Sequence, residues 1–144
     1  MSFHRTAFAA LLAAVLPAVS WAQSDSAPSE ALSVELNTAQ NVGNACRLTF
    51  LVQNGTGVSI DKAVFETVIF DTEGGVVSLS LFDFRDLPAD RPRVRQFDLP
   101  ERDCAQVGRA LINGANTCVV DGAESTICGD KLSLSSRVKV ELLG

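Results

Sequence analysis

Several of the side chains that enzymes commonly use are scarce in this sequence. Tyrosine is absent from the 144 residues, and histidine, tryptophan and methionine occur once each. The three single residues, Met1, His4 and Trp21, all fall within the first 22 positions. The chain from residue 23 onward therefore has no imidazole for a Ser-His-Asp or Cys-His catalytic set, for a metal site or for a base that titrates near neutral pH. We expect a protein without enzymatic activity and without a cofactor.

The first 22 residues predict a cleaved signal peptide. His4 and Arg5 form a short basic start, residues 7–19 are apolar, and residues 19–22 have the small-x-small pattern of a signal-peptidase site. The apolar stretch is too short to cross a bilayer, and Arg5 stands alone rather than in a twin-arginine motif. We expect general secretion, with a mature chain that starts at Gln23 and works in the periplasm.

Negative charge dominates the rest of the chain. Without Arg5 it has 11 basic against 17 acidic residues, a net charge of −6. This sign disfavours general binding of nucleic acid or of an anionic membrane. No apolar run after residue 22 approaches the length of a membrane-spanning helix. We therefore expect no transmembrane segment in the mature chain.

All four cysteines, Cys46, Cys104, Cys118 and Cys128, lie in the expected mature chain. An even count in an exported protein favours disulfides over metal binding, since no C-x-x-C motif and no histidine could complete a zinc site. Four cysteines allow three pairings. We favour Cys118 with Cys128, because the segment between them has the composition of an irregular loop, and Cys46 with Cys104 follows by exclusion. Reactive thiols are the competing interpretation.

Apolar and polar residues alternate along most of the chain, after a flexible segment at 23–30 that is rich in Ser, Pro, Ala and Asp. Period-two alternation is typical of half-buried β-strands. A helical turn is expected within residues 101–108, with Asp103 near its start. The predicted strands cover about residues 32–36, 46–52, 62–71, 76–84, 93–99, 109–113 and 132–142, the last as one long amphipathic strand.

Short strands with frequent turns, of which residues 71–75 form the clearest, predict an all-β protein. We expect one domain from residue 31 to 144, an antiparallel immunoglobulin-like β-sandwich of about six to eight strands with two disulfides. The strand at 62–71 is apolar on both faces and should lie at the centre of a sheet. The predicted core contains Leu48, Phe50, Phe65, Ile69, Leu79, Leu81, Val138 and Val140.

Residues 48–99 resemble the FxLYD-type bacterial β-sandwich. The shared features are a strand that ends in Asn54, a strand that ends in Phe70-Asp71, a glycine turn, and a strand that opens with Val76-Val77. The mature chain is also similar to a group of small exported alphaproteobacterial proteins, commonly labelled Tat pathway signal sequence domain proteins and of unknown function. Residues 84–88, 94–99 and 104–109 and the four cysteines carry this second resemblance. Both resemblances imply the β-sandwich fold, and neither implies a catalytic residue.

The densest basic cluster is Arg91, Arg93 and Arg95. Period two places these three guanidinium groups on one face of a strand, and Pro92 predicts that this strand lies at a sheet edge. Such a stripe could bind phosphate, a carboxylate-rich polymer or an acidic protein surface. The alternative is a solvated edge strand, whose charges resist aggregation and are balanced by acidic residues nearby in the sequence. Those acidic residues are Asp83, Asp86 and Asp90.

Two sets of carboxylates are weaker candidates. Asp121, Glu124 and Asp130 lie in or beside the cysteine loop and could bind calcium, but they lack EF-hand spacing, so a solvated loop is favoured. The aspartates at positions 83, 86 and 90 could act as paired carboxylates on a glycoside, but no Tyr or Trp is present to form a sugar platform.

The sequence as a whole predicts a periplasmic β-sandwich that acts as an accessory or interaction module for another envelope protein or an anionic macromolecule. The oligomeric state stays open. An enzyme inhibitor or small-ligand carrier that uses the end loops is the alternative, and a hydrolase is the third. A binding module should carry an exposed apolar or basic patch, whereas a carrier should enclose a pocket of several hundred cubic ångströms.

Overall fold

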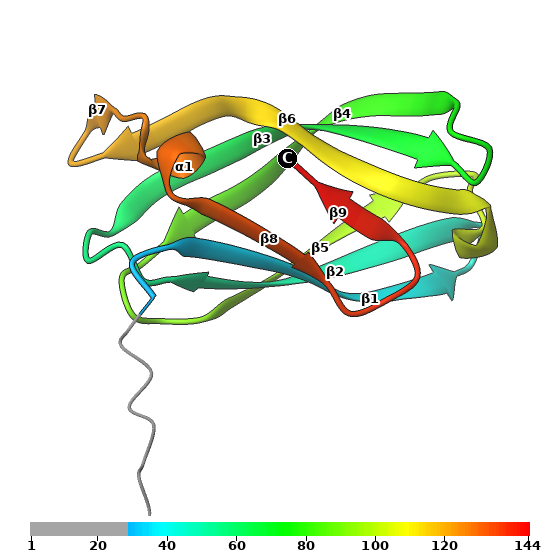
Figure 1. Cartoon of the computed structure of the whole chain (residues 1–144), viewed down its shortest axis with the longest axis horizontal. Coiled ribbons are helices and arrows are strands. Elements are labelled where there is room, and N and C mark those ends of the chain that lie inside the picture. Colours follow the sequence, from blue (N-terminus) through cyan, green and yellow to red (C-terminus); the bar gives the residue numbers. More distant parts are fainter. Residues whose placement is uncertain (1–28) are drawn as a thin grey trace, which may run out of the picture.

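The computed structural model describes residues 29–144, so the predicted signal peptide at 1–22 and most of the flexible segment at 23–30 lie outside the described residues. Residues 29–144 form nine strands, a 3-10 helix and a one-turn α-helix (Figure 1). The elements are β1 (Leu32–Val42), β2 (Ala45–Asn54), β3 (Ile60–Asp71), β4 (Val76–Leu87), β5 (Arg93–Leu99), η1 (Cys104–Gln106), β6 (Val107–Val120), β7 (Ala123–Glu124), α1 (Ile127–Asp130), β8 (Leu132–Ser136) and β9 (Glu141–Leu143).

The strands form two sheets that face each other, which confirms the all-β prediction (Figure 1). Sheet A has the order β5-β2-β1-β8, and sheet B has the order β4-β3-β6-β7 with β9 also paired to β6. Five of the seven pairings among the described strands are antiparallel, as predicted. The two C-terminal strands differ, because β8 runs parallel to β1 and β9 runs parallel to β6.

The core lies between the sheets and is built around phenylalanine. Phe50 of β2 and Phe65 of β3 are both buried and both meet the Phe84 ring of β4, with ring centroids 5.4 Å apart in each case. The edge-to-face geometry of these pairs suits the charge distribution of aromatic rings. The prediction of a core position is also confirmed for Leu48, Ile69 and Val140, whereas Val138 is only half-buried against this cluster.

The predicted burial of Leu79 and Leu81 is wrong, because 58% and 54% of these residues are exposed. They alternate along β4 with the positions that face the core, where Phe82 and Phe84 are buried. Successive side chains of a strand point to opposite faces. Since the two phenylalanines take the inner face, both leucines must point outward.

The predicted single strand over 132–142 is also wrong. The chain leaves sheet A at Ser136 and enters sheet B at Glu141, so β8 and β9 belong to different sheets. At the crossing, the Ser136 hydroxyl donates to the Val140 carbonyl oxygen at 2.5 Å, and the backbone N–H of Arg137 donates to the carbonyl of Leu36. This bend carries Val140 into the gap between the sheets, where it is buried.

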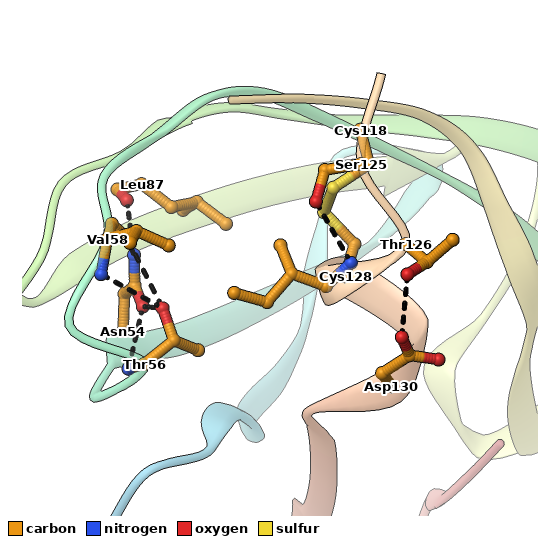
Figure 2. Close-up of a disulfide and its surroundings, with 10 residues drawn as sticks. Asn54, Thr56, Val58, Leu87, Cys118, Ser125, Thr126, Cys128 and Asp130 are labelled. Atoms are coloured by element: carbon orange, nitrogen blue, oxygen red, sulfur yellow. Dashed lines mark hydrogen bonds between the residues drawn. A yellow bond between two sulfur atoms is a disulfide. The ribbon is translucent and has the colours of Figure 1, made fainter. Parts of the chain in front are cut away.

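Both predicted disulfides are present. Cys46 of β2 is bonded to Cys104 of η1, and Cys118 of β6 is bonded to Cys128 of α1. The first bridge ties the start of β2 to the 3-10 turn that follows β5. The second ties α1 to sheet B and closes a loop with a sequence separation of only 10 (Figure 2).

Asn54, the last residue of β2, connects three segments at one end of the sandwich (Figure 2). Its buried side-chain amide donates to the carbonyl oxygens of Val58 at 2.8 Å and Leu87 at 2.7 Å. Its side-chain oxygen accepts from the backbone N–H and the hydroxyl of Thr56. One side chain therefore joins the end of β2, the loop after it and the end of β4.

Candidate functional site

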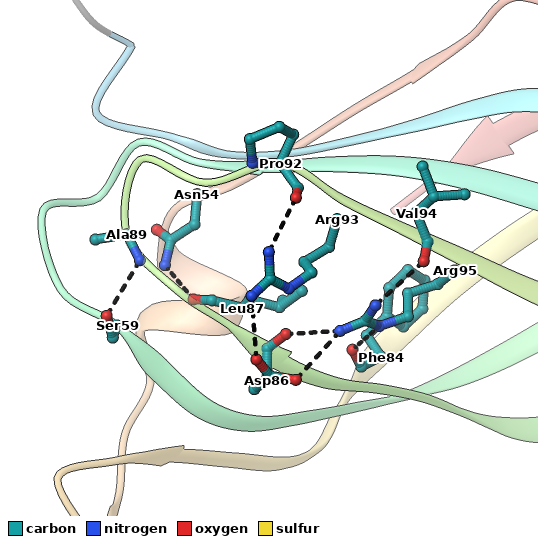
Figure 3. Close-up of polar contacts among 10 residues, drawn as sticks. All are labelled: Asn54, Ser59, Phe84, Asp86, Leu87, Ala89, Pro92, Arg93, Val94 and Arg95. Atoms are coloured by element: carbon teal, nitrogen blue, oxygen red, sulfur yellow. Dashed lines mark hydrogen bonds and ion pairs between the residues drawn. The ribbon is translucent and has the colours of Figure 1, made fainter.

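The predicted arginine stripe divides into two parts in the structure. Arg93 and Arg95 share one face of β5, which is an edge strand of sheet A as predicted, while Arg91 lies in the exposed turn before it. The face that carries Arg93 and Arg95 also carries the partly buried Phe97, and it points toward β4 of the opposite sheet (Figure 3). The stripe is therefore not one continuous exposed surface.

Arg95 spans the gap between the edges of the two sheets (Figure 3). Its Nε donates to the carbonyl oxygen of Phe84 at 2.5 Å, and its Nη2 donates to the carbonyl oxygen of Asp86 at 2.9 Å. The Asp86 carboxylate lies 3.3 Å from Arg95 and 3.6 Å from Arg93. Partial burial lowers the pKa of Arg95, and the negative charge of Asp86 acts in the opposite direction. Two of the three guanidinium groups are thus occupied within the chain.

Some members of the two carboxylate sets make local structural contacts. Asp130 accepts a hydrogen bond from the Thr126 hydroxyl at 2.6 Å (Figure 2). Asp121 occupies the turn between β6 and β7 with φ of 50°. Glu124 is exposed in β7. Within residues 29–144 no three side chains of the metal-ligating types gather into a candidate metal site.

Asp83 and Asp90, of the second carboxylate set, each lie where the chain turns or bulges. The Asp83 carboxylate accepts from the backbone N–H of Arg85, a residue with φ of 59° at an irregularity of β4. Asp90 has φ of 57°, and its backbone N–H donates to the carbonyl of Asn54. The carboxylates of Asp83 and Asp86 thus make local contacts, whereas Asp90 contributes its backbone N–H.

An open groove of about 850 Å³ runs along the gap between β4 and β5. At one end Arg95 closes the gap, and beside it the Phe82 and Phe97 rings stack with centroids 4.2 Å apart. Ser78 and Ser80 of β4 also border the groove. The charged residues that line it are Arg47, Arg85, Arg95 and Arg102 against Asp83 and Asp98.

The groove is locally basic although the chain is acidic. The Arg47 and Asp98 side chains form a two-contact ion pair at 2.7 and 2.9 Å, and this hydrogen bonding lowers the pKa of Asp98. Arg85 and Arg102 form no ion pair with any carboxylate of residues 29–144. Two guanidinium groups at this groove are therefore available to an anionic group from outside.

The outer face of sheet B carries an apolar row that the sequence analysis missed. Strand register places Leu79 of β4 beside Val68 of β3, Val68 beside Leu111 of β6, and Leu111 beside Leu143 of β9. Leu79 and Leu143 are exposed and Leu111 is partly exposed, while Val68 between Leu79 and Leu111 is buried. We call these four residues the outer row.

Two further apolar side chains extend the outer row along β4. Leu81 lies two residues beyond Leu79, and Val76 is 63% exposed where it faces Phe70 of β3. Arg109 stacks over the Phe70 ring at 5.9 Å and pairs with Glu141 at 3.9 Å, which places charge at the border. The sequence contained a signal for this row: Leu79 and Phe82 are three positions apart and so lie on opposite faces of one strand. Only one of these faces can point to the core between the sheets.

Comparison with known proteins identifies no relative, since no protein-family profile, no curated protein and no solved structure matches the chain. The longest helix among the described residues, α1, has four residues, and no helix there approaches the length and apolar character of a membrane span.

Proposed function

We propose that the protein is a non-enzymatic periplasmic β-sandwich that acts as an accessory or interaction module for another protein of the cell envelope. The outer row is the observation that carries this proposal. Four strands contribute to it in register, and its members at both ends are exposed. Exposed apolar side chains gathered on one face of a sheet are typical of sites of protein contact.

The compartment and the type of sandwich are parts of the same proposal. Two disulfides are typical of proteins that fold in an oxidising environment such as the periplasm. An immunoglobulin-like sandwich is supported by the two facing sheets, by the predominance of antiparallel pairs, and by the chain crossing from one sheet to the other after Ser136. The resemblance of residues 48–99 to the FxLYD-type sandwich points the same way.

A small-ligand carrier is the second candidate, because the groove between β4 and β5 falls in the size range of ligand sites. The groove is open along its length and lined by charged side chains, whereas a carrier for apolar molecules encloses its ligand in a largely apolar cavity. An interaction module accounts for both the groove and the outer row.

Photo-crosslinking in the cells that make the protein tests the proposed function. A photoreactive phenylalanine analogue is placed at Leu79 or at Leu143, at opposite ends of the outer row, and a matched control carries it at Gln53. Gln53 is exposed on the outer face of sheet A, two residues beyond the outward-facing Leu51. We expect the same protein to be crosslinked from both ends of the row and not from Gln53. Absence of any adduct from the row, or the same adducts from Gln53, contradicts the proposal.

A further inference from the structure

The free edge of β4 is long, and its one irregularity before Phe82 is a register shift at Val77. Natural sheets guard their edges with short strands, prolines or inward-pointing charges. Among the described strands, β4 pairs with β3 alone and has 12 residues, and its first six, residues 76–81, contain neither a charge nor a proline.

The other strands at the sheet edges of residues 29–144 are short or guarded. Pro92 and Pro100 flank β5, and its inward face carries Arg93 and Arg95. On the far sides of the sheets, β7 and β9 have two and three residues, and β8 has five before the chain crosses to the other sheet. Among residues 29–144, β4 is therefore the longest strand that pairs on one side only. The parts of β1 after Leu36 and of β6 between Leu111 and Val119 also lack a second partner strand, but each is shorter than the free edge of β4.

Arg95 limits the accessible part of this edge. Its guanidinium binds the carbonyl oxygens of Phe84 and Asp86, so the last third of β4 is already covered (Figure 3). Residues 76–83 remain. Eight residues of a strand extend about 26 Å, which is enough to pair with a strand of ordinary length.

The two faces of this stretch suit an added strand. On the outer face, Leu79 and Leu81 would be covered by the side chains of a neighbouring strand that point the same way. On the inner face, Ser78 and Ser80 border the groove of about 850 Å³. The groove leaves room for those side chains of the added strand that point inward. A bound strand would thus bury apolar surface on one side and fill the groove on the other.

Charge selects among possible occupants. Arg85 follows residues 76–83 in β4, and Arg102, which follows the end of β5, also lines the groove. Neither forms an ion pair within residues 29–144. An incoming segment with carboxylates near its ends would meet a guanidinium at each end of the groove. A second copy of this chain is a poorer fit, because two acidic chains repel each other and the edge of the second copy would place its own two arginines against the groove.

We propose that the edge of β4 binds an extended segment of a partner protein by strand addition, and that this segment alternates apolar and polar residues and carries Asp or Glu at its ends. This inference rests on the proposed function as an interaction module and specifies how the partner docks. Main-chain hydrogen bonds from residues 76–83 hold the segment, while Leu79 and Leu81 and the two unpaired arginines select it.

The test uses synthetic peptides as probes of the intact disulfide-bonded protein. The first is a fluorophore-labelled, end-capped decapeptide with a six-residue Thr-Val alternation and two aspartates at each end. A second peptide has lysines in place of the aspartates, and a third has alternate backbone nitrogens methylated, so that it cannot form a ladder. We expect the acidic peptide to bind, the lysine peptide to bind about tenfold more weakly and the methylated peptide not to bind.

Two pairs of variants localise the binding. Leu79→Thr with Leu81→Thr should weaken the acidic peptide by about tenfold or more, because each exchange removes apolar surface that the peptide would cover. The matched control is Val42→Thr, on an exposed valine (37%) at the end of β1 that does not line the groove, and it should change nothing. All these positions are exposed, so the melting temperature should stay within a few degrees.

The charge requirement has its own pair. Arg85→Gln with Arg102→Gln should remove most of the preference for aspartate over lysine ends, while Arg137→Gln, on an exposed arginine paired to Glu35, should leave it unchanged. Hydrogen exchange should slow at residues 76–83 when the acidic peptide is bound. Protection at residues 93–99 instead would overturn the choice of edge.

Three further outcomes overturn the proposal. One is equal binding of the acidic and lysine peptides, and another is no binding of any peptide. The third is a dimer in sedimentation that dissociates on exchange of Leu79 and Leu81, because the edge would then belong to a second copy. If the outer row still crosslinks to a partner in cells while no peptide binds, strand addition is wrong and the interaction module stands.

Discussion

Replacing Asn54 tests whether one buried amide holds together an end of the sandwich. Asn54→Ala removes two hydrogen-bond donors and one acceptor. The two shortest of the four lost hydrogen bonds, both 2.7 Å, join the Asn54 side chain to the Leu87 carbonyl and to the Thr56 hydroxyl. A buried carbonyl left without its donor costs about 1–3 kcal/mol, and each lost bond at the partly buried Val58 and Thr56 adds about 0.5–1.5 kcal/mol. With one such bond at Val58 and two at Thr56, the free energy of unfolding should fall by about 2.5–7.5 kcal/mol.

Urea denaturation of the oxidised protein measures this loss. A fall of about 3 kcal/mol would lower the melting temperature by roughly 10–15 °C in a domain of this size. Asn116→Ala is the matched control, because Asn116 is exposed and, within residues 29–144, its side chain makes one hydrogen bond, accepted from the neighbouring Thr117 hydroxyl. It should change the free energy of unfolding by less than about 0.5 kcal/mol.

Asn54→Asp adds a pH signature that simple loss of packing would not produce. The introduced carboxylate would face the carbonyl oxygens of Val58 and Leu87 in place of an amide donor, so burial and repulsion should raise its pKa in the folded protein. A raised folded pKa destabilises above that value and the penalty fades as the pH falls toward the ordinary carboxyl value of about 3.9. The deficit against wild type should be larger at pH 7.5 than at pH 4.5. A loss under 1 kcal/mol for Asn54→Ala, or a deficit for Asn54→Asp that does not vary with pH, would refute the reasoning.

Three other perturbations have expected outcomes. Phe65→Ala should cost about 3–5 kcal/mol in urea denaturation, because it empties a buried site against the Phe84 ring, and an unchanged transition would mean that β3 faces the other way. Replacing both Cys118 and Cys128 with alanine should lower the free energy of unfolding by about 3 kcal/mol or less, since the bridge closes a short loop. Thiol labelling of the unreduced, denatured wild type should find no free cysteine. The backbone N–H of Ala105 and the side chain of Asn41 lower the pKa of Asp103, so this carboxylate stabilises the fold above the ordinary carboxyl pKa and loses its effect as the pH falls through the lowered value. Asp103→Asn should therefore flatten the fall in melting temperature between pH 6 and pH 3, and an identical profile would exclude that contribution.

Strand positions could be predicted because the information is local. The predicted strand at 93–99 coincides with β5, and the helical turn expected at 101–108 contains η1 with Asp103 as its cap. The predicted ends of the strands were less accurate than their positions. β1 continues to Val42 and β6 to Val120, because pairing with a neighbouring strand maintains each of them. Hydrogen bonds to other strands, rather than the alternation itself, decide where a strand ends.

The candidate site shows what alternation leaves open. Period two establishes that Leu79 and Phe82 lie on opposite faces of β4, yet it does not say which face meets the other sheet. The arginines pose the same problem, because the sequence places Arg93 and Arg95 together without indicating that Asp86 lies across the gap. Each answer depends on a contact between strands of different sheets.

The sequence by itself determined the all-β class, most strand positions, the central place of β3 and the pairing of Cys118 with Cys128. All of these follow from alternation, turn residues or short-range loops, which act between neighbours in the chain. The tertiary structure alone decided that Leu79 points outward, that Arg95 closes the gap between the sheets, that the chain crosses over after Ser136 and that β4 keeps a free edge. The physical reason is that a strand's inner face and its edges are defined only by what packs against them, and those neighbours come from distant parts of the chain.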